Sequence, residues 1–445
     1  MDRLPRILQP FALRQYRWLA LGLALALFGD GIWLVALVWQ VIGLGGGPGA
    51  VSLMSGTAAS GMIVSTLFGG VLADRISQRA IIVGLETVKL IAFSTVGVAS
   101  AFGALTYAHL MAAALLGGVT TGMYYPAYSA LLPRVVSAAQ LLAANGIEGF
   151  LRPVLYQAAG PMIAGVIIGA TSPAAAIIVG AFACILSAAC YLAMGPVPDD
   201  DNAAAPRVEK RSGARGVAAD LGAGFAFMWT TPWLRATLFF SSFLVLMLMG
   251  PIEVLIPFAL KDRAGGGAFD HSIVLAAFGV GAALGAFVFA SMAMPRRYLS
   301  VMFALWTVCS IPLVIMGFAQ HTVWFAIAAF GVGLMLDGPL VLWGTLLQRR
   351  VPTELLGRIS SLDFFVSMAF MPVSMALAAP VSHLIGVSWT FVLAGLLPVP
   401  VAIAAYWLSR LDRDEIAHPL AIPEIDVSLS GAAIPDDSPP GPPVR

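Results

Sequence analysis

The sequence predicts an all-α membrane protein with twelve transmembrane helices, arranged as two parallel six-helix repeats. Three observations predict this class: the chain has many long apolar segments, it carries few charges, and its basic residues alternate from loop to loop. Of its 445 residues, 59% are hydrophobic and 11% are charged, whereas soluble globular proteins carry about 25% charged residues. Because a charge in hydrocarbon costs roughly 2.5–3.5 kcal/mol, this composition suits a chain that lies in a lipid bilayer.

Each predicted span is a stretch of predominantly apolar residues that is long enough to cross the hydrocarbon core, which takes about 20 residues. Backbone groups in lipid must be hydrogen-bonded within the segment, so these stretches are predicted to be helices. The twelve predicted spans are 18–43, 50–73, 80–104, 108–132, 141–169, 173–195, 233–260, 270–294, 300–319, 322–347, 357–386 and 388–409.

The basic residues test this number of spans. With twelve spans both termini lie on one side of the membrane, and twenty of the 24 Lys and Arg residues fall on that side. Only Lys261 and Arg263 fall on the other side, and Lys89 and Arg152 lie within spans. Since Lys and Arg accumulate in cytoplasmic loops, both termini are predicted to be cytoplasmic. The high Ala, Gly and Pro content favours a multi-pass protein of the cell (inner) membrane.

Two polar segments divide the chain into four predicted parts. Residues 1–195 are predicted to form an N-terminal six-helix bundle, and residues 233–409 a C-terminal one. Between them, residues 196–232 contain three consecutive Asp and four basic residues, which is typical of a cytoplasmic linker. The Pro-rich, polar segment 410–445 cannot bury a core of its own, so it is predicted to be a disordered cytoplasmic tail.

An internal repeat supports the two bundles. The segment LLPRVVSAAQLLAANGIEGF at 131–150 aligns with LLQRRVPTELLGRISSLDFF at 346–365, at a constant offset of 215 residues. The identity is modest, but the segments lie at equivalent junctions, between the fourth and fifth spans and between the tenth and eleventh. In proteins built from parallel six-helix repeats the substrate site lies between the halves, near the membrane midplane.

Ionisable groups inside the membrane are costly, so each one is a functional hypothesis. Asp30 lies 13 residues after Arg17, about 20 Å along a helix, near the middle of a hydrocarbon core about 30 Å thick. Asp337 is similarly central. Because burial favours the neutral form of a carboxyl group, either residue could take a proton from one side and release it to the other. The alternative is a neutral or paired carboxyl that packs the two halves together. The carboxylates in predicted spans are Asp30, Glu86, Glu148, Glu253, Asp337 and Asp363.

Two of these carboxylates have a basic residue on the same helical face. Glu86 and Lys89 are three residues apart and are expected to neutralise each other. Glu148 and Arg152 are four residues apart and could pair likewise. Arg152 lies deeper and directly precedes Pro153, so it is also a candidate for a side chain that faces a cavity.

Glu253 lies in the outer half of the seventh predicted span. Pro251 and Pro257 flank it and predict a broken helix, because proline removes a backbone hydrogen bond. Gating and plain packing are both compatible with this position. The proton-coupling and substrate candidates are Asp30, Asp337, Arg152 and Glu253.

The short charged turn after the second span resembles a family signature. The segment GVLADRISQR (70–79) is similar to the loop motif Gly-x-Leu-Ala-Asp-Arg-x-Gly-Arg-Lys of the major facilitator superfamily. It departs from the motif at Ser77 and Gln78, and Arg79 replaces Lys. The resemblance implies that Asp74 meets the cytoplasmic start of the eleventh span and locks the outward-facing state. The gating residues that it implies are Gly70, Asp74, Arg75, Arg79, Gly357 and Arg358.

The fifth predicted span contains AAGPMIAGVIIG (158–169). Gly160, Pro161 and Gly165 resemble the antiporter signature Gly-Pro-x-x-Gly-Gly of the same superfamily, with Ala164 at the first Gly of the closing pair. This signature is typical of drug/proton exporters. The alternative is ordinary helix packing, because small residues allow membrane helices to approach closely.

Three further segments resemble the branch of the superfamily that holds the enterobactin exporter, macrolide efflux proteins and mycobacterial multidrug pumps. They are GMYYPAYSALLPRVV (122–136), GPIEVLIPFAL (250–260) and the segment at 346–365. The resemblance implies the major facilitator fold and the extrusion of a small molecule in exchange for protons. The predicted function is therefore proton-coupled efflux of lipophilic small molecules by alternating access, with a small-molecule substrate, protons and the lipid bilayer as partners.

Other function classes lack support in the sequence. No Gly-x4-Gly-Lys-Ser/Thr segment, the phosphate-binding loop of ATP-binding proteins, is present. The sequence predicts no enzyme activity, no cofactor and no metal site. The net charge of +1 gives no attraction to nucleic acid, and the sequence leaves the oligomeric partner unknown. The alternatives are a uniporter or importer of a polar solute, a siderophore or lipid exporter, and a non-transporting membrane scaffold. A polar-solute carrier needs more Asn, Gln and Arg in its spans than this chain has, whereas the many Met, Phe and Trp suit an apolar ligand.

Overall fold

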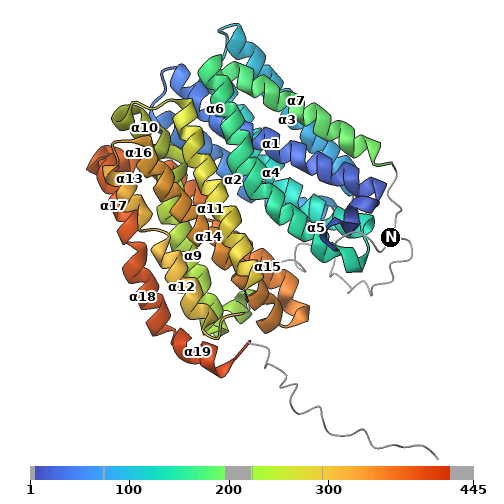
Figure 1. Ribbon diagram of the computed structural model, residues 1–445, viewed down its shortest axis with the longest axis vertical. Coiled ribbons are helices and arrows are strands. Elements are labelled where there is room, and N and C mark those ends of the chain that lie inside the picture. Colours follow the sequence, from blue (N-terminus) through green and yellow to red (C-terminus); the bar gives the residue numbers. More distant parts are fainter. Residues whose placement is uncertain (1–5, 74–75, 196–221, 223, 293, 421–445) are drawn as a thin grey trace, which may run out of the picture.

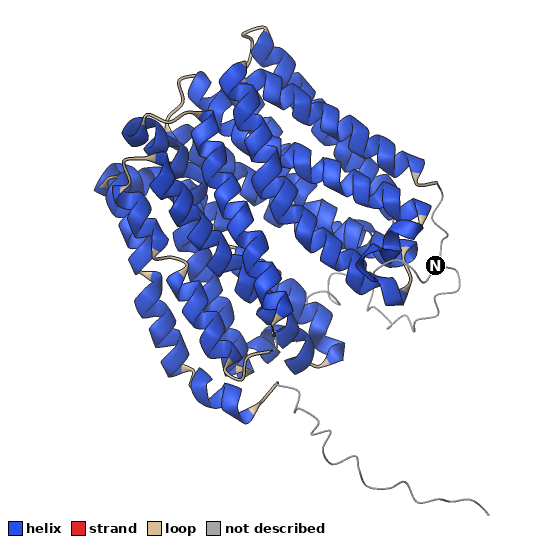
Figure 2. Cartoon of the chain, in the orientation of Figure 1, coloured by secondary structure: helices blue, strands red, loops and turns tan. Residues whose placement is uncertain are grey.

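A computed structural model describes residues 6–73, 76–195, 222, 224–292 and 294–420, and in these segments the secondary structure is entirely helical (Figure 2). The helices are η1 (Arg6–Ala12), α1 (Arg14–Gly43), α2 (Pro48–Ala73), α3 (Gln78–Ala101), α4 (Tyr107–Val135), α5 (Ala138–Leu151), η2 (Arg152–Ala159), α6 (Gly160–Ala170), α7 (Pro173–Ala193), α9 (Pro232–Gly250), η3 (Pro251–Leu255), α10 (Ile256–Ala264), α11 (Ala268–Ser291), α12 (Tyr298–Val308), α13 (Pro312–Phe318), α14 (Thr322–Arg350), α15 (Thr353–Met368), α16 (Met371–Ile385), α17 (Val387–Leu396), α18 (Pro398–Leu408) and α19 (Leu411–Ala417).

The all-helical membrane class is confirmed. Ten helices or continuous helical runs in the described segments are long and apolar enough to cross a membrane. They coincide with ten of the twelve predicted spans. At the other two predicted positions lie α2 and α4, helices of 26 and 29 residues, which are not among the ten.

Two of the long runs are interrupted by π-helical turns. The turn η2 separates α5 from α6, and the turn η3 separates α9 from α10. Proline occupies the first or second position of both turns, where its missing N–H group breaks the regular α-helical ladder. Such π-helical turns occur frequently at functional sites. The break predicted around Glu253 is η3.

The helices form two groups that lean against each other (Figure 1). Helices α1–α7 form one group and α9–α19 the other, and we call these groups the N-half and the C-half. In Figure 1 the two groups meet near α6 and α10 and diverge towards α5, α15 and α19. The end towards which they diverge is called the basic end, because it carries Arg14, Arg79, Arg134, Arg235, Arg349 and Arg350.

The halves contact each other at the end opposite the basic end. There α6 and the turn η2 pack on α11, and α2 packs on α16 and η3. A side chain on Gly165 of α6 would place its Cβ 2.1 Å from Ser272 Oγ of α11. Helices α6 and α11 therefore approach as closely as glycine permits. The Ser52 hydroxyl accepts a hydrogen bond from the backbone N–H of Ala379 at 3.1 Å. These contacts join α2 to α16 and α6 to α11 across the boundary.

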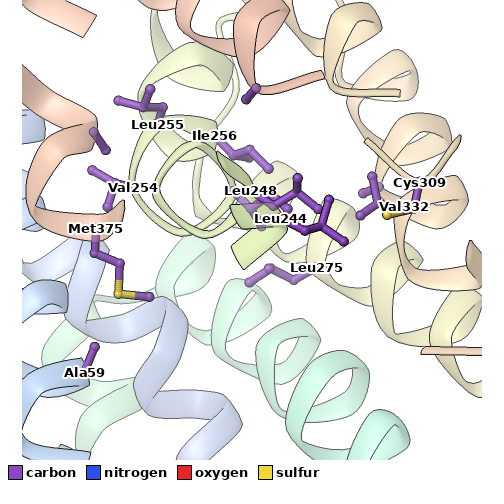
Figure 3. Close-up of a cluster of buried hydrophobic side chains, with 14 of the residues drawn as sticks. Ala59, Leu244, Leu248, Val254, Leu255, Ile256, Leu275, Cys309, Val332 and Met375 are labelled. Carbon is purple, nitrogen blue, oxygen red and sulfur yellow. The ribbon is translucent and has the colours of Figure 1, made fainter. Parts of the chain in front are cut away.

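The core around η3 is apolar and continuous with the contact between the halves (Figure 3). Leu255 ends the π-helical turn and Ile256 follows it, and Met375 of α16 points towards Ala59 of α2 in the N-half. The other labelled members are Leu244, Leu248, Val254, Leu275, Cys309 and Val332. Burying this surface on both sides of the turn fixes the position of η3 against the neighbouring helices.

The segment after the last span differs from the prediction. Residues 410–445 are predicted to be disordered, but residues 411–417 form α19. Glu415 of this helix is fully buried, and its carboxylate accepts a hydrogen bond from the backbone N–H of Ser300 at 3.0 Å. Asp414 pairs with Arg350 at the end of α14. A carboxylate at the N-terminus of α12 satisfies free N–H groups there, which explains why this short helix docks. Residues 421–445 and most of the predicted linker (196–221 and 223) lie outside the described residues.

Candidate functional site

Two adjoining cavities lie between the halves. They have volumes of about 140 and 170 Å³ and share three lining residues, Leu34, Tyr156 and Glu253. Pockets for drug-sized ligands measure about 300–1,000 Å³. Each cavity alone is therefore too small for such a ligand, and a ligand of that size would have to span both or widen one of them.

The first cavity lies mostly against the N-half and has an apolar, polarisable wall. Trp33 of α1 stacks on Phe93 of α3 with ring centroids 4.3 Å apart. Methionines from both halves complete the wall: Met62 comes from α2, and Met371 and Met375 come from α16. Methionine side chains are flexible and adapt to irregular apolar ligands. The polar groups of this cavity are Asp30, Ser55, Thr121, Tyr156 and Glu253.

The second cavity lies mostly against the C-half. Its wall is formed by aliphatic side chains of η3, α10, α11 and α14 together with Met249, Met316 and Phe278. Glu253 and Asp337 are its carboxylates, and Gln157 and Tyr156 are its other polar groups. Three predicted coupling residues, Asp30, Glu253 and Asp337, therefore line cavities between the halves.

Asp30 is held by a lysine on a neighbouring helix. Lys89 Nζ lies 3.0 and 3.2 Å from the two carboxylate oxygens of Asp30. The same Nζ lies 2.8 Å from Glu86 Oε1. Side-chain exposure falls from 23% for Asp30 to 3% for Lys89 and 0% for Glu86, so only Asp30 reaches the cavity. The expected Glu86–Lys89 pair is present, but it belongs to a three-membered cluster.

The charges of this cluster do not balance if both carboxyls are ionised. One ammonium group then faces two carboxylates in a buried site, and an unpaired buried charge is costly. Within the described part of the chain neither carboxylate oxygen of Glu86 has an aligned hydrogen-bond partner, although Oε1 lies near the ammonium group. Charge balance therefore favours a cluster that holds one proton in addition to those of Lys89.

Glu253 and Asp337 differ from Asp30 because they have no such partner. Among the described residues no hydrogen bond or ion pair joins either carboxylate to another side chain. The π-helical turn carries Glu253 into the junction of the cavities. Ser374 of α16 stabilises this break: its hydroxyl accepts from Gly250 N at 2.7 Å and donates to Leu246 O at 2.7 Å.

Arg152 has a different environment from the other predicted coupling residues. It pairs with Glu148 at 3.2 Å, as the spacing of four residues predicts, and its side chain is 41% exposed. It is not among the residues that line either cavity. In the described part of the chain, no cluster of three or more His, Cys, Asp or Glu side chains could hold a metal ion.

The predicted gating residues are described only in part. Asp74 and Arg75 lie outside the described residues, and so do the surroundings of Gly70 and Gly357 and the side chain of Arg358. Arg79 donates hydrogen bonds to the carbonyl oxygens of Tyr191 (2.7 Å) and Gly195 (2.8 Å). A cation at a helix C-terminus satisfies free carbonyl groups. In this conformation the hydrogen bonds of Arg79 thus link the start of α3 to the end of α7 within the N-half.

The antiporter-like segment lies at two close helix contacts. A Cβ on Gly160 would come within 2.8 Å of Gly31 on α1, so Gly160 and Pro161 pack inside the N-half. Gly165 packs on Ser272 of the C-half. Both contacts are close helix packing, and for Gly165 the packing joins the two halves.

Sequence reasoning missed several residues of the site. It did not single out Trp33, Phe93, Tyr156 or the methionines of α16, because aromatic and Met residues in a membrane helix look alike whether they face lipid, core or cavity. The link between Asp30 and Lys89 was also missed. The available signal was an imbalance of charge. The first and third predicted spans contain two acids, Asp30 and Glu86, but only one basic residue, Lys89.

Comparison with known proteins places this geometry in context. A sequence model described as the Major Facilitator Superfamily matches residues 19–369. The chain is 26% identical over 397 residues to "Multidrug efflux pump Tap" of Mycolicibacterium fortuitum, a match that covers 87% of this chain and 94% of the relative. It is 22% identical over 370 residues to "Macrolide efflux protein A" of Streptococcus pyogenes, with 82% and 89% covered.

Solved structures share the fold at low sequence identity. The nucleoside transporter NupG has a TM-score of 0.67 at 12% identity, and the match covers 88% of this chain and 98% of that one. A POT family transporter in complex with 5-aminolevulinic acid also has a TM-score of 0.67, at 14% identity, with 88% and 95% covered. These likenesses concern the arrangement of the helices.

Proposed function

The chain belongs to the major facilitator superfamily of membrane transporters, and from this premise we propose that it exports lipophilic small molecules in exchange for protons. The observation that carries the proposal is the pair of cavities between the halves. They combine an aromatic and Met-rich wall with carboxylates from both halves. Such a site accommodates an apolar ligand and can exchange protons, the two properties that a proton-coupled exporter of lipophilic compounds needs.

The sidedness follows from the basic residues. The positive-inside rule supports a cytoplasmic location for the basic end of an inner-membrane protein, and with it cytoplasmic termini. The halves contact each other at the opposite end, so the conformation corresponds to an inward-facing carrier. Alternating access then requires these contacts to open while the basic ends of the halves approach each other.

The proposed working parts are an N-terminal bundle (1–195), a cytoplasmic linker (196–232), a C-terminal bundle (233–409) and a cytoplasmic tail (410–445). In the outward-facing state the loop that contains Asp74 approaches the start of α15, around Gly357 and Arg358. A carboxylate at a helix N-terminus is favourable, and this contact would hold the basic end closed. The family resemblance of the loop supports this part of the proposal.

Reconstitution tests the function. Full-length protein in liposomes is given a fluorescent lipophilic drug and an imposed proton gradient. We expect the drug to accumulate on the side from which protons leave, and a protonophore to abolish this accumulation. Transport by Asp30→Asn and Asp337→Asn is compared with transport by the control variant Asp262→Asn. Asp262 is exposed, so the control should transport as the wild type does.

Other outcomes would favour the alternatives. Drug movement that only follows the drug's own gradient and ignores the proton gradient would identify a uniporter. Proton-independent transport of a polar solute would identify an importer, a function that the apolar cavity walls disfavour. The relatives named as multidrug and macrolide efflux proteins support export, and a siderophore or lipid is a further candidate substrate of the same class of carrier.

A further inference from the structure

We propose that Gln157 is a specificity-determining residue of the carrier, which selects compounds that place an uncharged hydroxyl group in the second cavity. The inference rests on the proposed function and deepens it, because it names a chemical group of the substrate and the residue that recognises it. Recognition is a property of binding at equilibrium and needs no proton gradient. It can therefore be tested separately from transport.

The first observation is an unpaired amide in the wall of the second cavity. Gln157 lines this cavity, and its Oε1 atom is buried without a hydrogen-bond partner in the described part of the chain. The polar neighbours of Gln157 in the cavity are Tyr156, Glu253 and Asp337, and none of them pairs with this oxygen. The large majority of buried side-chain polar atoms in folded proteins have a partner. A partner from outside the chain is therefore expected here.

The second observation is that close packing fixes the position of this residue at the boundary between the halves. Gln157 belongs to the π-helical turn η2 of the N-half. A Cβ on Gly279 of α11 would lie 2.9 Å from the Gln157 Cβ, so η2 and α11 approach as closely as glycine permits. The terminal amide can still turn about its last bond, which exchanges its oxygen and its nitrogen. A ligand in the second cavity can thus meet either an acceptor or a donor.

The third observation is the contrast between this amide and the apolar part of the wall. Leu275 of α11 and Val332 of α14, both labelled in Figure 3, belong to that part. Apolar side chains hold the carbon skeleton of a ligand, whereas a few polar groups fix its orientation and provide specificity. Gln157 is uncharged, unlike Glu253 and Asp337. It can therefore pair with a hydroxyl group, which donates and accepts hydrogen bonds, without burying another charge.

The selection follows from the displacement of water by the substrate. While the second cavity holds no substrate, water can hydrogen-bond to the amide of Gln157, and a ligand that fills the cavity displaces this water. A ligand with a hydroxyl group replaces the lost hydrogen bond. A purely apolar ligand leaves the buried amide unpaired, which is costly. A site of this kind rejects analogues without the hydroxyl group more strongly than a hydrophobic pocket rejects a missing methylene group.

The test is isothermal titration of purified full-length protein in detergent with two probes of similar shape. The probe para-phenylphenol carries a hydroxyl group, and para-methylbiphenyl carries a methyl group in its place. Both probes partition into micelles, so each affinity is compared between wild type and variant in the same detergent, where the partition cancels. Gln157→Met keeps the length of the side chain and removes the amide. We expect it to weaken binding of para-phenylphenol about tenfold and to change binding of para-methylbiphenyl by less than about twofold.

Stability separates recognition from a purely structural role. If the amide of Gln157 only held the fold together, its removal would lower the thermal midpoint of the protein without ligand. Because the oxygen has no partner among the described residues, we expect the midpoint of Gln157→Met to equal or exceed that of the wild type. A lower midpoint together with equal losses for both probes would assign Gln157 a structural role and overturn the inference.

Matched variants complete the experiment. Gln320 is exposed between α13 and α14, so Gln320→Met should leave both affinities unchanged. Wild-type protein that does not bind para-phenylphenol would overturn the inference, and so would a loss of its binding in Tyr156→Phe but not in Gln157→Met. Intact selective binding together with failure of drug transport in liposomes would instead overturn only the proposed function.

Discussion

Lys89 is the only basic side chain that the described structure buries beside two carboxylates. It contacts Asp30 on α1 and Glu86 on its own helix, at 3.0 and 2.8 Å. It thereby links the two helices that supply Trp33 and Phe93 to the cavity wall. The stacking of these two rings depends on the distance between α1 and α3, so the cluster also shapes the cavity.

We expect Lys89→Met to destabilise the protein by about 3–5 kcal/mol at neutral pH, because it leaves buried carboxylates without their cation. The loss should be larger at about pH 8 than at about pH 5, since protonated carboxyls tolerate burial and the folded variant binds more protons than the unfolded chain. Reversible unfolding in mixed micelles at both pH values measures the effect.

The double variant Lys89→Met/Glu86→Gln provides the control for the preceding expectation. It removes the ammonium group and one of the two carboxyl groups, and it leaves Asp30, which reaches the cavity. It should therefore recover part of the stability, and the double-mutant cycle should give a favourable coupling between the two sites. Additive effects of the two substitutions would contradict a shared cluster.

At the scale of the element, short segments fix the ends and breaks of the long helices. Two acidic residues of α19, the last described helix, bind the ends of other helices. Glu415 accepts a hydrogen bond at the start of α12, and Asp414 pairs with Arg350 at the end of α14. Arg350 also lies over the ring of Trp233, at 4.7 Å from its centroid. Through these contacts α19 holds α9, α12 and α14 together at the basic end.

We expect Glu415→Ala to lower the stability by about 1–3 kcal/mol, because the half-buried Ser300 loses the acceptor of its backbone N–H and the helix loses a buried side chain. The control is Arg413→Ala on an exposed face of the same helix, which should change stability by no more than about 0.5 kcal/mol. Thermal midpoints of the purified variants compare them. Equal midpoints for the two variants would show that α19 does not stabilise this end.

The contact of α6 with α11 gives another expectation at this scale. A Cβ at Gly165 meets Ser272 Oγ at 2.1 Å and Ala268 O at 3.0 Å, whereas a Cβ at Gly169 meets nothing within 4 Å. We expect Gly165→Val to separate the halves at the end opposite the basic end, and Gly169→Val to leave them unchanged. The rate of thiol labelling of a cysteine introduced at Ser55, in the first cavity, reports the opening from that side. Equal labelling rates in both variants would contradict a shared interface.

At the scale of the whole molecule, the contacts described above between the halves lie between the level of the cavities and the end opposite the basic end. Besides the packed helices, Trp39 Nε1 donates to His271 Nδ1 at 3.3 Å, which joins α1 to α11. A carrier that works by alternating access must break these contacts in every cycle. These contacts therefore break during each transport cycle. Their strength sets how often the end opposite the basic end opens.

We expect a short thiol cross-linker between Trp39→Cys and His271→Cys to stop transport almost completely, because it prevents the halves from separating at this end. Binding of substrate from the basic end should persist, since the cross-link lies at the other end and the two groups of helices diverge at the basic end (Figure 1). Drug transport and binding by the cross-linked protein in liposomes measure the two effects. The single-cysteine variants control for reaction at Cys184, Cys190 and Cys309, which are buried. Full transport after complete cross-linking would contradict a rocking motion about the cavities.

The sequence by itself determined the membrane class, the positions of the long helices, the break at Glu253 and the family. These features depend on local properties: the length of an apolar stretch, the placement of basic residues, prolines and short signatures. The Glu86–Lys89 and Glu148–Arg152 pairs were likewise readable, since both partners lie on one helical face.

Only the tertiary structure decided which residues meet across helices. It joined Lys89 to Asp30, left Glu253 without a cation, turned Gly165 towards Ser272 and docked α19 on α12 and α14. The rotation of a helix about its axis is set by packing against its neighbours, and a membrane helix that is apolar all round carries little sign of that rotation in its sequence. For this reason the list of candidate acids came from the sequence, whereas the distinction between a paired and an unpaired acid required the packed structure.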